Sequence, residues 1–234
     1  MLTVATWNVL HRIHGENWDE AVVRQWPDER ERIAAITRTI AGLDAQVIAL
    51  QEVSGDQLES LRGLPRQLLA FRYPRLPALR RGPAQLQAPA EYLVVLTDGP
   101  AVEVTAAAFA SDPGKGLLAV RFGATTIVDT HVSFGDHSRS QLRQLAELAA
   151  AAPGAAVVLG DFNMGLAAVA AAFGPGFTVH DPGPAVPSRP RPAGAAKSTT
   201  IDHVFVRGAA PLATTVLDVQ GLSDHNPVLA RIRM

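Results

Sequence analysis

The sequence predicts an α/β protein in which mixed β-sheets are covered by helices. Nine short apolar runs have the character of buried or half-buried strands, whereas helical spacing of apolar residues is clear in only two segments. Two pairs of runs, near 91–108 and 116–133, are spaced as in hairpins. Strands that outnumber helices and include hairpins favour a layered sandwich over a simple alternation of strand and helix.

The expected strands are spread over the whole chain. They cover residues 2–9, 45–50, 91–97, 116–122, 125–132, 155–160, 200–206, 213–219 and 226–232. One helix is expected around 33–43, where isoleucine and leucine recur at helical spacing behind Pro27. Another is expected over 138–151, where leucines recur in the same way and Ser138 is placed to cap the helix N-terminus.

Two segments between these elements are predicted to be loops. Residues 62–90 contain six arginines and no acidic residue, and residues 181–199 are rich in proline and glycine. Long loops beside strand ends often carry function, but a flexible surface insertion would have the same composition.

Composition limits the chemistry that the chain can perform. With 234 residues, 47% of them hydrophobic, the chain can bury one sizeable core, and we expect residues 1–234 to form a single domain. The formal net charge of −1 argues against a dedicated non-specific nucleic-acid binder. The absence of cysteine excludes disulfides and thiolate catalysis. Any metal must therefore be bound by carboxylates, amides, imidazoles and water, a set that suits Mg²⁺ or Mn²⁺.

The chain shows no membrane or export signal. Its first residues carry no basic stretch followed by a long apolar run, and no apolar run is long enough to span a bilayer. We therefore expect a cytoplasmic protein without integral membrane association, with a monomer as the default state.

Polar residues follow four of the expected strands at the point where each strand ends. These residues are Asn8, Gln51, Glu52, Asp129, His131, Asp161 and Asn163. In layered α/β proteins, ligands gather where strand ends and their loops converge. Buried carboxylates are costly unless they are paired or bound to a metal. The pattern therefore predicts one site at a shared edge of the sheets.

Each of these residues has a structural alternative beside its functional reading. Glu52 could cap the helix that follows, or it could offer a hard oxygen to a metal ion. Asn8 could bond to the backbone of a turn, or it could orient a carboxylate or bind the ion through its carbonyl. GDFN at 160–163 could be an Asx-turn, or Asp161 could activate water while Asn163 donates to a phosphoryl oxygen.

A second pair of residues is expected from the C-terminal third of the chain. Asp202 shares one face of its strand with valines, so it needs a partner, and His225 in the segment SDHNP is the candidate. An Asp–His pair holds one imidazole tautomer and suits general acid–base work or a cationic clamp on a phosphate oxygen. Asp224 could reach a metal, whereas His203 is expected to be packed or at the surface.

Six short motifs in the chain occur in a recognisable order. They are TWN near the start, LQEV at 50–53, TH at 130–131, GDFN at 160–163, ID at 201–202 and SDH at 223–225. Each motif alone is weak, but six in order at sensible spacing are specific. From Asn8 to His225 the chain resembles the endonuclease/exonuclease/phosphatase superfamily, which includes deoxyribonuclease I-like enzymes, abasic-site endonucleases, sphingomyelinases and inositol polyphosphate phosphatases.

The resemblance implies a four-layer α/β sandwich, two mixed sheets faced by helices, and metal-dependent hydrolysis of a phosphate ester. It implies that Glu52 is the principal magnesium ligand, assisted by Asn8, with manganese as the alternative ion. It implies that Asp161 orients or deprotonates the attacking water and that Asn163 contacts the scissile phosphate.

The resemblance also implies roles for the remaining polar residues. Asp202 would pair with His225, Asp224 would help with the metal or the geometry, and His131 would bind phosphate or assist the leaving group. Whether Asp161 or the Asp202–His225 pair is the base stays open.

The chain departs from the family pattern at two places. Leu10 stands where abasic-site endonucleases carry an additional carboxylate, and no Gly-Asn pair precedes the expected strand 91–97. Both departures weaken an assignment to the deoxyribonuclease-like or sphingomyelinase-like branches.

The substrate is left open by the sequence. A nuclease, acting on DNA or RNA, would use the arginine-rich segment 62–81, in which aromatic residues are interleaved for backbone contacts and base stacking. A small-molecule or lipid phosphodiesterase would need only a local basic pocket, which Arg189, Arg191 and Lys197 could form. The alternative of another class is a non-catalytic binding module that has kept the fold.

Overall fold

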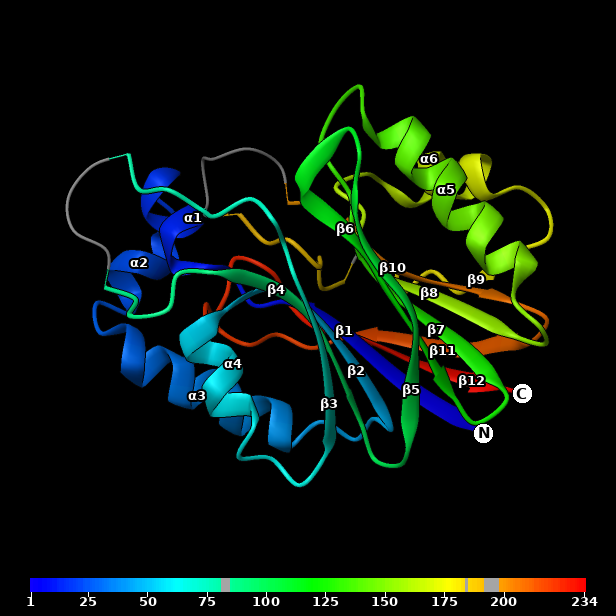
Figure 1. The fold of residues 1–234 in the computed structure, drawn as a ribbon, viewed down its shortest axis with the longest axis horizontal. Coiled ribbons are helices and arrows are strands. Elements are labelled where there is room, and N and C mark those ends of the chain that lie inside the picture. Colours follow the sequence, from blue (N-terminus) through cyan, green and yellow to red (C-terminus); the bar gives the residue numbers. More distant parts are fainter. Residues whose placement is uncertain (81–84, 184, 192–197) are drawn as a thin grey trace.

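Two six-stranded β-sheets pack face to face and carry helices on their outer faces (Figure 1). The computed structural model describes residues 1–80, 85–183, 185–191 and 198–234. Two basic residues of the sequence hypotheses, Arg81 and Lys197, lie outside the described residues.

The first sheet has the strand order β11-β12-β1-β2-β4-β3. Its central pair, β1 and β2, is parallel, and the other neighbours are antiparallel. The strands are β1 (Leu2–Asn8), β2 (Val47–Ser54), β3 (Gln67–Arg72), β4 (Glu91–Thr97), β11 (Ala210–Val216) and β12 (Val228–Arg233).

The second sheet has the order β5-β6-β7-β8-β10-β9, and again its central pair, β7 and β8, is parallel. The strands are β5 (Ala101–Phe109), β6 (Asp112–Phe122), β7 (Thr125–His131), β8 (Ala156–Asp161), β9 (Thr178–Val179) and β10 (Asp202–Arg207). Both sheets therefore contain parallel and antiparallel neighbours, as expected for mixed sheets.

Helices close the two outer faces of the sandwich. α3 (Glu29–Ala41) and α4 (Gly55–Leu61) cover the first sheet, and α5 (Ser138–Ala151) and α6 (Leu166–Phe173) cover the second (Figure 1). Two short helices, α1 (Arg12–Asn17) and α2 (Ala21–Gln25), follow the end of β1. The succession helix, sheet, sheet, helix confirms the four-layer sandwich.

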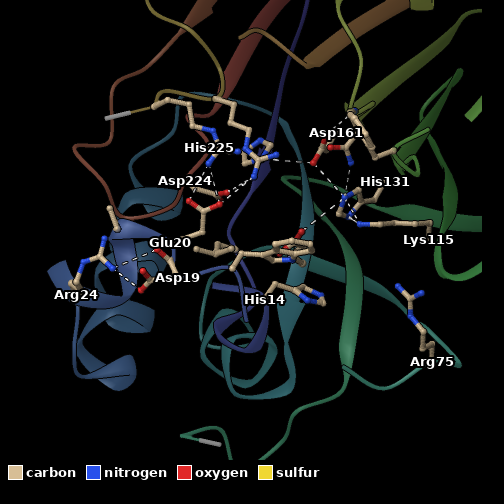
Figure 2. A pocket seen from close by; sticks show the side chains of 18 residues that line it. His14, Asp19, Glu20, Arg24, Arg75, Lys115, His131, Asp161, Asp224 and His225 are labelled. Atoms are coloured by element: carbon tan, nitrogen blue, oxygen red, sulfur yellow. Dashed lines mark hydrogen bonds and ion pairs between the residues drawn. The ribbon is translucent and has the colours of Figure 1, made fainter. Parts of the chain in front are cut away.

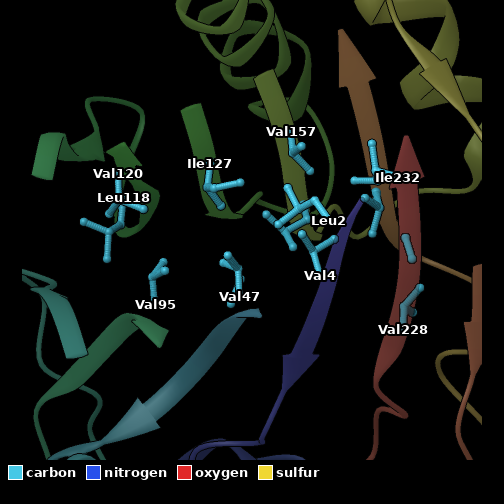
Figure 3. Packing of buried hydrophobic residues seen from close by; sticks show 14 of the residues in the cluster. Leu2, Val4, Val47, Val95, Leu118, Val120, Ile127, Val157, Val228 and Ile232 are labelled. Carbon is cyan, nitrogen blue, oxygen red and sulfur yellow. The ribbon is translucent and has the colours of Figure 1, made fainter. Parts of the chain in front are cut away.

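Branched aliphatic side chains fill the layer between the two sheets (Figure 3). Val4 and Val47 of the first sheet face Ile127 and Val157 of the second, and all four side chains are fully buried. β-Branched residues suit this position because they are stiff and pack well on a pleated surface. The packing fixes how the two sheets sit against each other.

Three local predictions were wrong. The segment expected as a loop over 62–90 contains β3, a half-exposed edge strand whose pattern lacks clear alternation. β4 and β5 do not form a hairpin, because β4 is already paired with β2 and β3 on its two edges and the chain crosses to the other sheet after Thr97. His137, not Ser138, is the N-cap of α5, and the Ser138 hydroxyl donates to the carbonyl of Gly135 instead.

The hairpin expected near 116–133 is confirmed, since every residue of β7 pairs with the 116–122 part of β6. Among the described residues, the longest helices are too short or too polar to cross a bilayer.

Candidate active site

The two central parallel pairs deliver polar residues to one edge of the sandwich. Asn8 ends β1 opposite Gln51 of β2, and His131 ends β7 opposite Asp161 of β8. β10 runs antiparallel to β8, so that its first residue, Asp202, also lies opposite Asp161. The site expected at a shared edge of the sheets therefore has a structural basis in strand direction and register.

Irregular backbone conformations set the direction of two side chains of the site, those of Glu52 and Asn163. The pairing of β2 with β4 shifts between Leu50 and Val53, and within this bulge Glu52 adopts a positive φ of 57°. Leu10 and Asn163 also have positive φ values, 57° and 52°. This conformation is uncommon for residues with a Cβ and concentrates at functional sites, where the surrounding structure holds it in place.

One amide holds two carboxylates side by side. Asn8 Nδ2 donates to Glu52 Oε1 at 3.2 Å and to Asp161 Oδ2 at 3.0 Å. The amide oxygen of Asn8, Oδ1, accepts from the backbone N–H of Leu10, and Glu52 Oε2 accepts from that of His11, both at 3.0 Å. Of the two functional roles considered for Asn8, this geometry supports the orienting one.

Asp161 lies between two imidazoles. Its Oδ2 is 3.3 Å from His131 Nε2 and 3.8 Å from His225 Nε2, while its Oδ1 accepts from the backbone N–H of Asn163 at 2.9 Å. Burial acts to raise the pKa of Asp161, but the charges of His225 and His131 outweigh it and hold that pKa well below its usual range. Asp161 is therefore an ionised carboxylate at neutral pH.

Glu52 is also ionised, for a similar reason. Burial acts to raise its pKa, but the cationic groups around it, led by His14, outweigh burial and lower that pKa well below its usual range. His14 itself bonds through Nε2 to Glu91 Oε2 at 2.9 Å. The edge of the sheets thus holds two ionised carboxylates, those of Asp161 and Glu52, which face each other across the Asn8 amide.

The expected partnership of Asp202 and His225 is present. His225 Nδ1 lies 2.9 and 3.1 Å from the two oxygens of Asp202, and the hydroxyl of Ser188 donates to Asp202 Oδ2 at 2.6 Å. Trp7 Nε1 donates to the backbone carbonyl of His225 at 2.9 Å, which fixes the loop. Burial acts to lower the pKa of His225, but Asp202 and the neighbouring acids raise it to about 10, so the imidazole is protonated at neutral pH.

Asn163 reaches towards His131. Its Nδ2 donates to the backbone carbonyl of Val132 at 2.9 Å and lies 3.4 Å from His131 Nε2. His203, in contrast, is buried away from the cluster and bonds to the carbonyl of Met164 at 2.8 Å, as expected for a packed histidine.

The cluster opens into a cleft of about 800 Å³ (Figure 2). Among the residues singled out from the sequence, the cleft is lined by Glu52, His131, Asp161, Asn163, Asp224 and His225. Asn8 and Asp202 lie behind this surface and act on it through Asp161 and His225. Asp224 accepts from Arg189 Nη2 at 3.0 Å.

The basic segments divide between the cleft and the rest of the surface. Arg189 and Arg191 line the cleft, as does Arg75. Arg66, however, bonds to the carbonyl of Ala45 at the start of β2, at the opposite end of that strand from Glu52. The arginines that the structure describes in the segment 62–81 therefore do not form one continuous basic surface.

Lys115 is a cleft residue that sequence reasoning missed. It precedes Gly116, which pairs with His131, and its Nζ lies 3.1 Å from His131 Nδ1. The signal was available in the register of the 116–133 hairpin, which places the residue before Gly116 beside the TH motif.

The donor set fits a divalent metal ion. Asp161, Asp202 and His225 offer ligand atoms that all lie within 4.8 Å of one another. Both oxygens of Asp202 are already engaged by His225 and Ser188, whereas Glu52 and Asp161 share the amide of Asn8 and face the cleft. Ionised carboxylate oxygens held close together are the ligands that hard divalent cations prefer.

Solved structures with the same fold are similar to the whole chain. TDP2 from D. rerio, in a complex with a single-strand DNA product, is 15% identical, with a TM-score of 0.70 over 100% of this chain and 99% of that chain. ANGEL2, a 2',3'-cyclic phosphatase in a complex with adenosine-2',3'-vanadate, is 15% identical, with a TM-score of 0.64 over 100% and 95%.

A third similar structure, a functionally unknown conserved protein from Enterococcus faecalis V583, is 16% identical, with a TM-score of 0.66 over 99% of each chain. A search of the curated proteins finds no match.

A family comparison agrees with the fold. The model of the Endonuclease/Exonuclease/phosphatase family matches residues 5–225, a range that includes all six sequence motifs. The resemblance stated from these motifs, and the metal-dependent phosphoric ester hydrolysis that it implied, are thereby confirmed at the level of the family. The chain belongs to the endonuclease/exonuclease/phosphatase family.

Proposed function

We propose that this protein is a magnesium-dependent phosphodiesterase that acts on nucleic acid or nucleotides by in-line attack of water. The observation that carries the proposal is the convergence of Glu52, Asp161 and His225 on one cleft, with Asn8 bonded to both carboxylates. Residues from both sheets meet there, and each is chemically competent for phosphoryl transfer.

Glu52 is proposed as the principal ligand of the ion, and Asn8 as the residue that orients it. A divalent ion bound there would neutralise charge on a phosphoryl oxygen and on the leaving oxygen. Asp224 is proposed to act on the geometry of the cleft rather than on the ion, because its carboxylate already pairs with Arg189 at 3.0 Å.

The proton chemistry follows from the charges of the free enzyme. Asp161 is ionised and accepts the proton of the attacking water. His225, protonated and held by Asp202, donates from Nε2 to a phosphoryl or leaving oxygen. Asn163 and His131 supply further donors on the other side of Asp161. Asp161 is thus favoured over the Asp202–His225 pair as the base.

Nucleic acid is favoured as the substrate class for two reasons. The TDP2 structure holds a single-strand DNA product and the ANGEL2 structure an adenosine-2',3'-vanadate, so two proteins of the same fold bind ligands built from nucleosides or nucleotides. The cleft of this chain is also lined by Arg75 and by Lys115, which contacts His131, and this suits a substrate with more than one phosphate.

The proposal is tested on the purified protein with magnesium or with chelator. Supercoiled plasmid, single-stranded DNA, RNA and a generic aryl phosphodiester are offered side by side, and His225→Ala serves as the control for contaminating enzymes. We expect cleavage of nucleic acid that requires both the metal and His225. Activity that survives chelation would contradict the metal role, and magnesium binding without turnover on any substrate would indicate a non-catalytic binding module.

A further inference from the structure

One wall of the cleft carries an exposed aromatic ring beside two cations. Phe134 follows the strand that ends at His131, lines the cleft, and exposes 85% of its surface. Arg75 and Lys115 line the same cleft. Lys115 forms no ion pair with a carboxylate of the described residues, and its nearest polar partner there is His131.

Asp112 holds this wall together. Its Oδ1 accepts from Arg75 Nη1 at 2.8 Å and from the backbone N–H of Gly114 at 3.1 Å, and its Oδ2 accepts from the hydroxyl of Ser133 at 2.9 Å. One carboxylate thus joins the arginine, the segment that leads to Lys115 and the residue before Phe134. Of the two cations, only Arg75 pairs with this acid, and Lys115 pairs with no carboxylate of the described residues, so the wall keeps a net positive charge.

Arg75 lies against the backbone of Gly114. Its guanidinium occupies the space that a Cβ atom at position 114 would take, so a larger residue there would make this flexible side chain shift. The Arg75 side chain remains about half exposed, and only one of its guanidinium nitrogens is bonded to Asp112. Its remaining donors are available to an anion in the cleft.

The backbone that leads to Phe134 is held by hydrogen bonds, whereas the Phe134 ring is exposed. The backbone N–H of Val132 donates to the carbonyl of Asp161 at 2.9 Å, and that of Ser133 donates to Gln141 Oε1 at 2.8 Å. Trp18, the other exposed aromatic residue of the cleft, has the guanidinium of Arg80 over its ring at 4.8 Å. Among the described residues, Phe134 has no aromatic or cationic group on either face of its ring.

We propose that Phe134, Arg75 and Lys115 form a recognition site for the nucleotide next to the scissile phosphate. The base stacks on Phe134, and the neighbouring phosphate binds Arg75 and Lys115, while Asp112 acts as the positioning residue. Because a base in a duplex has both faces covered by its neighbours, the substrate is single-stranded at this point. This inference rests on the proposed function, of which it names the substrate more closely.

The test measures binding, in chelator, so that it does not depend on turnover. Fluorescence anisotropy compares a single-stranded oligodeoxynucleotide, an abasic polymer with the same number of phosphates, and a duplex, each over a range of salt concentrations. We expect the single strand to bind about tenfold more tightly than the abasic polymer, as one stacked base supplies.

Substitutions separate the base from the phosphate. Phe134→Ala removes the preference for the single strand over the abasic polymer and changes binding of the abasic polymer less than twofold, whereas Phe134→Tyr retains the preference. Arg75→Ala weakens both ligands to the same extent and lowers the salt slope by about one. Arg62 is an exposed arginine outside the cleft that pairs with Glu59. Trp18→Ala and Arg62→Ala are the matched controls and retain the wild-type pattern.

Two results would overturn the inference: equal binding of the single strand and the abasic polymer, or a preference that is lost in Trp18→Ala and kept in Phe134→Ala. The proposed function fails separately. Cleavage of the aryl phosphodiester without any base preference would leave the function intact and remove the recognition site. Base-dependent binding without turnover would support the recognition site and contradict the proposed function.

Discussion

The two walls of the cleft carry similar cations with opposite consequences. On the first wall Arg75 pairs with one carboxylate, Asp112, whereas Lys115 pairs with no carboxylate in the part of the chain that the structure describes, and both cations face the cleft. On the second wall, formed by Glu20, Arg189, Arg191 and Asp224, two arginines meet two carboxylates.

The ion pairs of the second wall have short distances between their nitrogen and oxygen atoms. Arg191 Nη1 bonds both oxygens of Glu20 at 3.0 and 3.1 Å, and Arg189 Nη2 lies 3.0 Å from Asp224 and 3.4 Å from Glu20. Arg189 and Arg191 connect the segment 185–191 to the start of α2. The cations of the first wall, Arg75 and Lys115, remain available to a ligand. The partners of a cation, rather than the number of cations, decide whether it binds substrate or braces the structure.

The largest effect is expected at Asp161, the proposed base. Asp161→Asn removes the proposed base with almost no change in shape, so kcat should fall about a thousandfold. Steady-state kinetics on the best substrate checks this, with thermal unfolding as the control for folding. A variant that folds and keeps most of its activity would remove Asp161 from the mechanism.

The next effect concerns the metal, whose proposed ligand Glu52 belongs to neither wall. Magnesium should raise the unfolding temperature of the wild-type protein, because a ligand that binds only the folded state stabilises it. Glu52→Gln should weaken magnesium binding at least about tenfold, since it removes the proposed anionic ligand. Titration calorimetry measures the change, and Asp112→Asn, which alters a carboxylate of the first wall, should leave magnesium affinity unchanged.

A smaller effect is expected at His14, which lines the cleft (Figure 2) and pairs with Glu91. Burial acts to lower the pKa of His14, but Glu52 and Glu91 raise it above 6.5, so its stabilising contribution is complete below pH 6.5 and is lost as pH rises through the folded pKa. Burial acts to raise the pKa of Glu91, but His14 lowers it below 4.5, so its contribution is complete above pH 4.5 and is lost at more acid pH.

The pair should therefore stabilise the fold most between pH 4.5 and 6.5. We expect Glu91→Gln to lower the free energy of unfolding by about 1–2 kcal/mol in that window, and by less on either side. Denaturant unfolding across the pH range measures the difference. A difference that does not vary with pH would show that the loss is one of packing rather than of charge.

The smallest effect sharpens the contrast between the walls directly. Glu20→Gln releases the charge of Arg191 and part of that of Arg189, so binding of single-stranded DNA should become about two- to fivefold tighter and its salt slope steeper. Anisotropy in chelator measures both quantities. Weaker binding would indicate that the arginines must be held by Glu20 to contact the ligand.

Much of the fold could be predicted because it rests on short apolar runs. β4 and β7 match the expected strands at almost every residue. β3 was missed because its short apolar run, residues 68–71, stands among prolines and arginines that are typical of a loop, and because an edge strand that is half exposed along its length shows no alternation. The 91–108 hairpin failed for a related reason, since local spacing does not reveal which edges of a strand are already paired.

The candidate site was predictable where single residues end single strands. Asn8, His131 and Asp161 are of this kind, and the parallel pairs bring them together. The walls were not predictable, because Arg191 and Glu20 are 171 positions apart and Arg75 and Asp112 are 37 apart. Only the folded structure shows that Arg189 and Arg191 are paired with two carboxylates, whereas Arg75 keeps donors that can bind a ligand.

The bond between Asn8 and Asp161 connects a residue of one sheet to a residue of the other. The distance between Glu52 and Asp161 is therefore set by how closely the two sheets pack, and the valine and isoleucine side chains of Figure 3 determine that spacing. Changing the volume of a side chain in this layer would move the two carboxylates apart or together. The preference of the site for a smaller or a larger ion would then be adjusted from the interior of the protein, by residues that never touch the ion.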